Sequence, residues 1–386
     1  MTQHPDPVVD PIANPAIDPA VVVPPRSLQG LLDSRQKISE LDPMNILGSI
    51  EALPDQIEHT WSLRSTITNL ENIQGFEPKQ IVVAGMGGSA LGAQVIKSLY
   101  AQELLSPIEI VNQYELPGYV DSQTLVVLSS YSGTTEETLS AAQDAKARGA
   151  KVAVICSGGR LQELAEENAW SLFLIVPTHN PSNQPRMAIG YAVFAMLALF
   201  SEMKLLDISD AQVTSVIHML RQTAKGLSPD QVEGNVAKTL AYASVDRQLL
   251  LLSAEHLRGA VHVVNNQLNE NAKNFTIEHH LPELNHHLME GLQFPSQMHE
   301  STLAILFHSS FYHARVSARF PLTQDVIEQN HIGTQTVQVI GDTPLHQVWE
   351  VIQLGSYLNF YLAMLNGINP APIPWVDYFK SHLPKQ

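Results

Sequence analysis

The chain has 386 residues, 44% of them apolar and 16% charged, which is typical of a globular protein and excludes a disordered chain. The formal net charge of −16 disfavours nucleic acid and anionic membrane surfaces as partners, because both would repel the chain. Cys156 is the only cysteine, so an intrachain disulfide and a zinc site of several thiolates are excluded, as expected for a cytoplasmic protein.

Prolines recur at near-regular spacing through residues 1–27, at Pro5, Pro7, Pro11, Pro15, Pro19, Pro24 and Pro25. Proline fixes its backbone angle and lacks an amide proton, so this stretch predicts a disordered or extended arm. It has no Lys or Arg before Arg26, which argues against a secretory signal sequence. Residues 28–70 have a helical pattern and are expected to form an N-terminal helical segment.

Residues 71–225 alternate short apolar runs with amphipathic segments. This alternation predicts an α/β domain with a parallel sheet covered by helices on both faces. The apolar run Ile189–Phe200 is shorter than the roughly 20 residues of a membrane crossing and predicts a buried helix. The expected strands are Ile81–Ala84, Ile108–Val111, Leu125–Ser129, Val152–Ile155 and Leu172–Val176.

The same pattern returns more weakly in residues 226–386, after a predicted helix at Ala211–Leu227. The sequence therefore predicts two α/β domains joined near Gly226–Asn235. The expected elements of the second domain are strands at Gln248–Leu252, Leu303–Phe307 and Thr336–Ile340 and a long helix at Gln347–Leu365.

The loop Gly85–Ser89 lies between a predicted strand and a predicted helix. Glycines let backbone N–H groups approach an anion, and the start of a helix adds further donors. Gly85, Gly87 and Ala90 also fit a dinucleotide-binding fingerprint, which needs an acidic residue about 20 positions further on. The second strand ends at Asn112 instead, so an anion site is favoured over a dinucleotide site, and a tight turn without a ligand remains the third interpretation.

A second loop, SSYSGTTEET at Ser129–Thr138, also follows a strand and opens a helix. Its hydroxyls and N–H groups are neutral donors suited to a phosphate. A simple helix cap is the alternative interpretation. Two such loops after two parallel strands nevertheless favour one shared anion site.

Residues 267–291 concentrate acid/base side chains. They hold Glu270 and the four histidines His279, His280, His286 and His287. The histidines invite a metal interpretation, but adjacent side chains diverge and Pro282 breaks the one-turn spacing of two helical ligands. His299-Glu300 begins like a zinc-protease signature, yet Leu303 stands where the second histidine is required, so no metal is predicted.

These motifs, taken in order, resemble the bifunctional phosphoglucose/phosphomannose isomerases, a family built from two sugar isomerase (SIS) domains. The resemblance rests on AGMGGSALG, SSYSGTTEET, QPRMAIGY, QLNENAK and LPELNH, and it extends from about Gly75 to the C-terminus. It implies SIS domains at residues 71–225 and 226–386, no cofactor and a homodimer with a shared active site. The implied reaction interconverts glucose 6-phosphate or mannose 6-phosphate with fructose 6-phosphate.

The resemblance also implies a role for particular residues. Glu270 matches the base, Arg186 lies beside the reacting carbons, and His286 assists ring opening from the neighbouring subunit. Lys380 matches a lysine near the ring oxygen. The residues implied in phosphate binding are Gly87, Gly88, Ser89, Ser130, Ser132 and Thr135.

The chemistry of an enediol reaction suits these side chains. A carboxylate with a raised pKa can carry the proton between two carbons, a guanidinium can stabilise the enediolate, and an imidazole can protonate the ring oxygen. Two plainer interpretations compete: Glu270 on a helix face paired with Lys273, and Arg186 as an ordinary surface residue in a first helical turn.

Two departures from the family pattern leave other functions open. Val263-Val264-Asn265 stand where family members often carry Arg-Trp-Lys, and His287-Leu288 stand where Asn-Glu is usual. The alternatives are a non-catalytic sugar-phosphate sensor and an isomerase of an amino-sugar phosphate.

Overall fold

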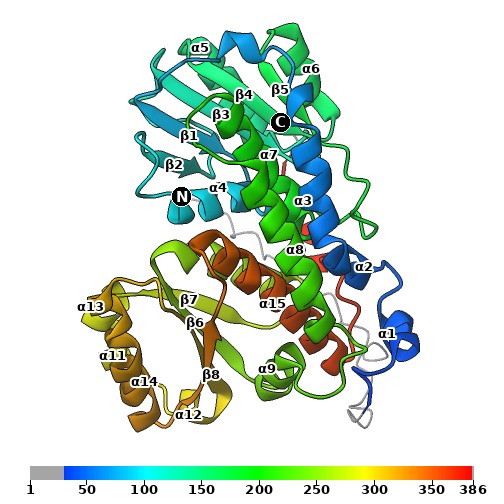
Figure 1. Cartoon of the computed structure of the whole chain (residues 1–386), viewed down its shortest axis with the longest axis vertical. Helices are drawn as coiled ribbons and strands as arrows, with labels where there is room; N and C mark the ends of the chain where they lie inside the picture. The colour runs from blue at the N-terminus through cyan, green and yellow to red at the C-terminus, as the bar shows by residue number, and fades with distance from the viewer. Residues whose placement is uncertain (1–29, 385–386) are drawn as a thin grey trace, which may run out of the picture.

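The computed structural model describes residues 30–384, so the predicted proline-rich arm lies outside the described residues. Two parallel sheets, A and B, form the upper and lower halves of Figure 1. The helices α3 (Leu53–Ser62), α7 (Ile189–Glu202) and α8 (Asp210–Leu227) run along one side of both halves. The predicted junction near Gly226–Asn235 contains the end of α8 and the turn before α9 (Val236–Ser244).

Sheet A has the strand order β2-β1-β3-β4-β5, with every neighbouring pair parallel. All five predicted strands are present, with ends that differ by a few residues at most. Their bounds are β1 (Gln80–Ala84), β2 (Ile108–Val111), β3 (Thr124–Ser130), β4 (Lys151–Cys156) and β5 (Ser171–Leu174).

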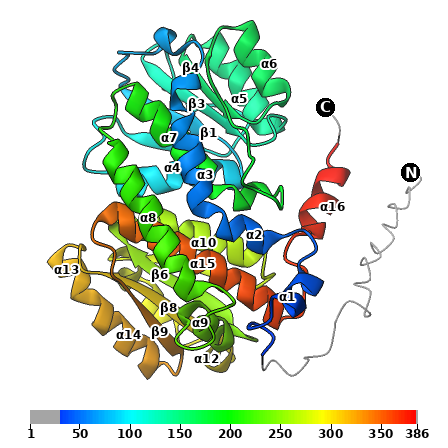
Figure 2. The ribbon, with the colours of Figure 1, turned by 45° about the vertical axis from the view of Figure 1, so that its right-hand side comes forward.

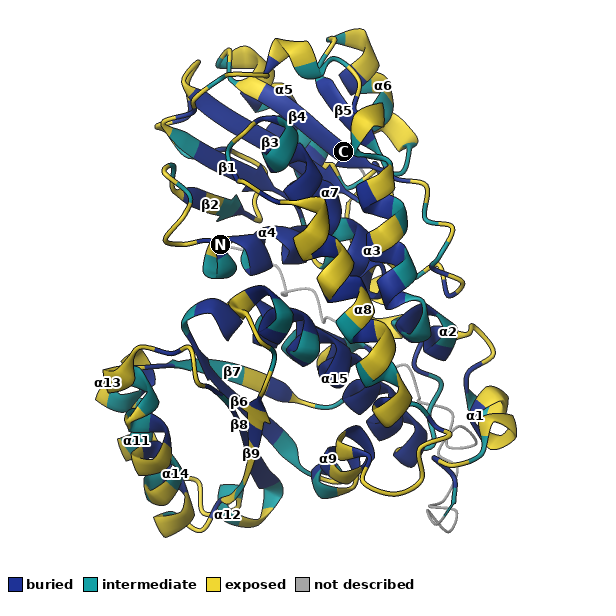
Figure 3. Ribbon diagram, in the orientation of Figure 1, coloured by how far each residue is buried: buried dark blue, intermediate teal, exposed yellow. Residues whose placement is uncertain are grey.

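Helices cover both faces of sheet A, as predicted. Side chains alternate along β1: Ile81 and Val83 face the core that contains α4 (Gly88–Leu99) and α7. Val82 and Ala84 face the opposite core, formed with α5 (Glu136–Ala147) and α6 (Gly159–Glu167). The central strands β1, β3 and β4 are therefore buried on both faces, as Figure 3 shows. The apolar run in α7 is buried as expected, and within residues 30–384 the structure has no helix with the length and apolarity of a membrane span.

Sheet B repeats this arrangement with the order β7-β6-β8-β9. The helices α10 (Arg258–Glu270) and α15 (Pro344–Leu365) pack on one face, and α14 (Arg319–Gln329) packs on the other (Figures 1 and 2). The strand bounds are β6 (Gln248–Ala254), β7 (Thr276–Leu281), β8 (Thr302–Ser309) and β9 (Gly333–Val339). The sequence interpretation missed β7, and it started β9 three residues too late and ended it one residue too late.

Close packing of α10 joins the two halves. A Cβ added at Gly259 would lie 2.3 Å from the Gln94 carbonyl oxygen of α4, so only glycine lets these helices approach. On the opposite side of α10, the Val264 side chain would meet a Cβ at Gly355 of α15. Val263 and Val264 are fully buried, so a basic residue in their place would disrupt this contact.

The ends of the described chain differ in how they pack. The predicted N-terminal helical segment forms α1 (Arg35–Leu41), α2 (Ile46–Glu51) and α3, and α3 packs against α7 and α8. The C-terminal helix α16 (Pro374–His382) has no buried residue and stands away from the body in Figure 2.

Candidate active site

The two loops predicted to hold an anion lie at the carboxyl edge of sheet A. The strand β1 lies between β2 and β3, so the strand order reverses at β1: the chain adds β2 on one side of it and then β3 on the other. In an open parallel sheet a crevice forms at such a reversal of strand order, and ligands generally bind there. The loop Gly85–Ser89 follows β1 and the loop Ser129–Thr138 includes the end of β3, so both border this crevice.

Hydrogen bonds join the two loops. The Ser89 hydroxyl accepts a bond of 2.8 Å from the Tyr131 N–H, and the Ser129 hydroxyl donates a bond of 2.8 Å to the Ser89 carbonyl. Ser130 Oγ and Thr135 Oγ1 share a bond of 2.9 Å. The loops are thus fixed relative to each other before any ligand arrives. Ser132 is exposed and bonds only with Thr134, so its hydroxyl stands at the outer side.

Two helix N-termini open onto this crevice. The N-cap residue of α4 is Gly87, with φ of +49°, and that of α5 is Thr135, and neither caps its helix through a side chain. The first N–H groups of an α-helix have no partner within the helix. In α4 the Ser89 and Ala90 N–H groups donate to the Met86 and Gly87 carbonyls, so that helix offers an anion the Gly88 N–H and its dipole. The helix α5 offers its first N–H groups and its dipole. Thr135 bonds to Ser130 rather than to its own helix, which argues against the plain helix-cap interpretation.

Arg186 lies in the 3-10 turn η4 (Pro185–Met187) and is only 2% exposed, so it is not the surface residue of the plainer interpretation. Its Nε donates to Asn271 Oδ1 at 2.5 Å, and Nη2 donates to the carbonyls of Pro370 and Ala371 at 3.0 and 2.7 Å. Burial lowers the pKa of Arg186, but a guanidinium remains charged at neutral pH.

The remaining nitrogen of Arg186 faces the predicted base. Nη1 donates to Gln184 Oε1 at 2.8 Å and lies 3.7 Å from Glu270 Oε2. A guanidinium has five N–H donors, and four already have acceptors. One N–H beside the Glu270 carboxylate is therefore available to a substrate oxygen.

Glu270 is the last residue of α10, and burial raises the pKa of its carboxyl group. The positive charges of Arg186, Lys273 and Lys380 oppose this shift without cancelling it. Lys273 donates to the backbone carbonyl of Glu270 and leaves the carboxylate free, so the plainer interpretation of a surface Glu–Lys pair does not describe this side chain. A half-buried carboxylate with a raised pKa beside a guanidinium can accept a proton from carbon.

A buried polar network behind these residues escaped the sequence interpretation. Gln267 donates to the Arg186 carbonyl at 3.1 Å, and Asn271 donates to Asn359 Oδ1 at 2.8 Å. Asn359 in turn donates to Gln267 Oε1 at 3.1 Å. The available signal was positional: Gln267 and Asn271 flank Glu270 within QLNENAK, and Asn359 interrupts the apolar helix α15.

The structure separates His286 from Glu270. The strand β7 starts just after Glu270 and runs parallel to β6, so η6 (Glu283–His286) lies at the opposite edge of sheet B. The six residues of β7 span roughly 20 Å, which no pair of side chains bridges. The His286 side chain is exposed at that edge.

Lys380 lies on the exposed helix α16. Its charge reaches Glu270, whose pKa it helps to lower, and Asp377 on the same helix acts on Arg186. Charged side chains of α16 thus act on Glu270 and Arg186, although no residue of the helix is buried.

The histidines near His286 in the sequence and on α10 contact neighbouring side chains. His262 Nδ1 lies 2.5 Å from Glu278 Oε1, His280 Nδ1 lies 3.0 Å from Ser253 Oγ, and the rings of His279 and His287 pack edge to face. Burial is the main cause that lowers the pKa of His280 to about 4. Within residues 30–384, no three His, Cys, Asp or Glu side chains are grouped so that they could hold a metal ion.

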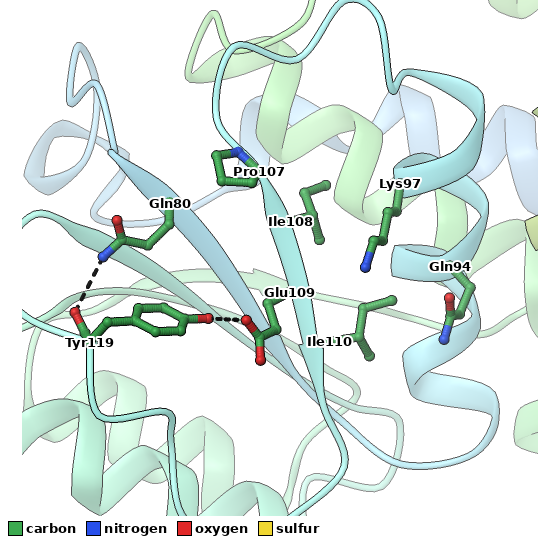
Figure 4. A pocket seen from close by; sticks show the side chains of 8 residues that line it. All are labelled: Gln80, Gln94, Lys97, Pro107, Ile108, Glu109, Ile110 and Tyr119. Atoms are coloured by element: carbon green, nitrogen blue, oxygen red, sulfur yellow. Dashed lines mark hydrogen bonds between the residues drawn. The ribbon is translucent and has the colours of Figure 1, made fainter.

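A large open groove lies elsewhere, along the edge strand β2 (Figure 4). Its volume is about 610 Å³, and its lining includes Lys97, Glu109 and Tyr119. Glu109 is already bonded to Tyr119, and none of the predicted site residues lines the groove. The smaller cavity of about 10 Å³ at Gly88 and Ser89 is the one that belongs to the paired loops.

Comparisons with known proteins agree with this geometry. Residues 76–203 match the SIS domain family, and residues 233–383 match the bacterial phospho-glucose isomerase C-terminal SIS domain. A bifunctional phosphoglucose/phosphomannose isomerase from Caldicellulosiruptor bescii is 32% identical over 87% of this chain and 98% of its own length. One from Thermoplasma volcanium is 28% identical over 79% of this chain and 91% of its own length. A solved structure of a hypothetical protein from Thermus thermophilus has the same fold, with a TM-score of 0.69 at 17% identity over 91% of this chain and 92% of that one.

Proposed function

The chain belongs to the bifunctional phosphoglucose/phosphomannose isomerase family, and we propose that it interconverts glucose 6-phosphate or mannose 6-phosphate with fructose 6-phosphate. It is a sugar-phosphate isomerase, an intramolecular oxidoreductase, built from two SIS domains. The observation that carries the assignment of the site is the Glu270 carboxylate, whose pKa is raised and whose Oε2 lies 3.7 Å from the Arg186 guanidinium.

The phosphate group of the substrate binds at the two paired loops. Ser89, Ser130 and Thr135 supply hydroxyls, and the first turns of α4 and α5 supply N–H groups and their dipoles. Ser132 contributes from the outer side. Binding by neutral donors leaves the sugar chain free to extend toward Arg186 and Glu270.

The proton is carried between the two carbons by Glu270. Its carboxylate removes the proton from carbon 2 of the open-chain aldose and returns it to carbon 1, while the hydroxyl proton on oxygen 2 passes to oxygen 1. The reverse reaction uses the same group. The free N–H of Arg186 stabilises the charge that develops on the enediolate oxygen. Because the Arg186 side chain is held by four acceptors, it needs no rearrangement when that charge appears.

Ring opening is assigned to the partner subunit's His286, because His286 of the same chain lies too far from Glu270. This assignment makes the active molecule a homodimer with shared sites, and Lys380 on α16 supplies a further positive charge near the ring oxygen.

The function is tested by an isomerase assay with glucose 6-phosphate and mannose 6-phosphate in parallel, in the presence of a chelator. We expect fructose 6-phosphate from wild-type protein and a loss of about 1000-fold or more in kcat for Glu270→Gln, since the proton acceptor is removed. Sugar-phosphate binding, followed as thermal stabilisation, should persist in that variant because the loops are untouched.

Glu350→Gln is the matched control, since Glu350 is also a carboxylate whose pKa burial raises, but it bonds to the backbone of Ile340 and Gly341. It should keep full turnover. Unchanged turnover in Glu270→Gln would reject Glu270 as the base. Binding without turnover in the wild-type protein would instead identify a sugar-phosphate sensor.

A further inference from the structure

Two cations of the site converge on one backbone carbonyl. The Pro370 oxygen accepts from Arg186 Nη2 at 3.0 Å and from Lys273 Nζ at 3.2 Å. The same Lys273 ammonium donates to the Glu270 carbonyl at the end of α10. Lys273 thus joins the helix that carries the predicted base to residues 366–373, which connect α15 and α16.

A second bond ties the same two segments together. Asn366, just after α15, donates to the Ala272 carbonyl at 3.3 Å. Lys273 itself has φ of +53°, a left-handed conformation that costs a non-glycine residue free energy and that points to a local requirement. The side chain of Lys273 remains accessible to solvent, and two of its three N–H donors are in use.

These bonds matter for α16 because no residue of that helix is buried. Its position therefore depends on residues 366–373, which Arg186 and Lys273 hold at Pro370. Lys380 is borne by α16, so the distance from Lys380 to the predicted base depends on the same contact.

Lys273 also acts on the base through its charge. It is one of three positive charges that lower the pKa of Glu270, together with Arg186 and Lys380. Burial and the neighbouring Arg186 lower the pKa of Lys273 itself to about 8, and Glu270 opposes that shift. Asp377 on α16 adds a negative charge that acts on Arg186.

We propose that Lys273 is a positioning residue of the isomerase: it fixes residues 366–373 against the end of α10, so that Glu270, Arg186 and Lys380 keep one spacing. Its positive charge also opposes the effect of burial on the Glu270 carboxylate. This inference rests on the proposed function, because the spacing matters only if Glu270 is the base.

The test compares Lys273→Met, which removes both donors and charge, with Lys273→Arg, which keeps both. For Lys273→Met we expect kcat to fall about tenfold while KM changes less than about threefold, because the phosphate loops are untouched. The acid limb of the kcat/KM profile should move to higher pH, since Glu270 loses a neighbouring positive charge. Lys273→Arg should restore kcat and the acid limb, and its alkaline limb should lie above that of the wild type because arginine does not lose its proton.

The matched control is Lys151→Met, since the Lys151 ammonium also donates to a backbone carbonyl, that of Asn72, but at the amino end of β4. It should leave kcat and the pH profile unchanged. If the wild-type protein turns over normally and the acid limb of Lys273→Met is unshifted, the role of Lys273 is overturned and the proposed function stays intact. A purely structural role would lower the melting temperature of Lys273→Met without moving that limb, and absent wild-type turnover would reject both the function and this inference.

Discussion

Two opposing effects set the pKa of Glu270. Burial favours the neutral acid, whereas Arg186, Lys273 and Lys380 favour the carboxylate, and the pKa is raised overall. A base with a raised pKa takes up a proton from carbon more readily than an ordinary surface carboxylate would.

This opposition predicts a pH-dependent gain in stability for Glu270→Gln. Because the pKa is higher in the folded than in the unfolded protein, the folded state binds the proton more tightly, and ionisation destabilises it as the pH rises through the folded pKa. Glutamine resembles the neutral acid, so the variant should melt at a higher temperature than wild type at pH 8. Below the unfolded pKa, near 4.5, the difference should disappear. Thermal melts across this pH range measure it.

Glu328→Gln gives a control of opposite sign. Hydrogen bonds from Thr334 and Gln324 lower the pKa of Glu328, so removing its charge should leave the melting temperature unchanged or lower it at pH 8. A Glu270→Gln protein less stable than wild type at pH 8 would mean that the ion pair with Arg186 outweighs burial.

The resemblance indicated two charged residues that the structure brings together, but not the neutral side chains that hold them. Arg186 and Glu270 were identified because their motifs resemble a family, and the structure brings them within 3.7 Å. Asn271 and Asn359 were missed. An amide side chain has no recognisable pattern in the sequence, and these two bond to each other across 88 residues. Long-range hydrogen bonds are not encoded in local periodicity.

At the scale of elements, the two sheets repeat one strand order but differ at the crevice. In sheet B the loop after β6 begins with Glu255, whose carboxylate accepts from the His313 N–H at 3.1 and 3.2 Å. The Ser309 hydroxyl at the end of β8 donates to Gln347 Oε1 at 2.5 Å. A carboxylate thus stands at the loop that corresponds to Gly85–Ser89, and its negative charge disfavours an anion there.

The loop after β3 depends on a glycine with a specific requirement. Gly133 has φ of +67°, and a Cβ there would lie 1.8 Å from the Gly158 carbonyl oxygen. We expect Gly133→Ala to lower the free energy of unfolding by about 3 kcal/mol or more, because strain from the left-handed backbone adds to the clash. It should also weaken sugar-phosphate binding, since the Gly133 N–H holds the Ser130 hydroxyl. Chemical denaturation and ligand titration measure the two effects.

Gly149 separates strain from clash. It has the same φ of +67°, but nothing lies within 4 Å of an added Cβ. Gly149→Ala should therefore cost only about 1–2 kcal/mol, the strain alone, and leave binding unchanged. Equal losses of unfolding free energy in Gly133→Ala and Gly149→Ala would show that the clash with Gly158 adds nothing to the strain.

The strand β7 shows where prediction from the sequence fails at this scale. Most strands of sheet A are continuous apolar runs because both faces are covered, and all five were predicted. β7 is an edge strand with the sequence TIEHHL, and only its first and last residues are buried. It was not predicted as a strand, because an edge strand can carry polar residues such as His279 and His280 without forming an apolar run.

At the scale of the whole molecule, the site and its proposed ring-opening histidine lie at opposite edges of sheet B. Glu270 ends α10 close to the start of β7, whereas His286 follows the end of β7. The α10 helix, with 13 residues, spans roughly 20 Å, the same separation that β7 gives. A complete site within one chain would require sheet B to break, so a second copy is the simpler source of the imidazole.

Complementation between two inactive variants tests this arrangement. Chains with Glu270→Gln and chains with His286→Asn are coexpressed with different tags, and dimers that carry both tags are isolated. In such a mixed dimer one site combines both defects, and the other combines an intact Glu270 with the partner subunit's His286. Because a two-fold dimer has two equivalent shared sites, we expect about half of the wild-type activity, although each variant alone is inactive.

The double variant Glu270→Gln/His286→Asn, paired with wild-type chains, separates shared sites from sites within one chain. If the site is shared, the wild-type Glu270 faces the asparagine that replaces His286 in the variant chain. The other site combines the glutamine of the variant chain with the wild-type His286, so both sites fail. If each site lies within one chain, the wild-type chain keeps its own site and half of the activity remains. The two mixed dimers thus give opposite results under the two arrangements. Activity retained in the dimer of double variant and wild type would place His286 beside Glu270 of its own chain, which would contradict the separation across β7.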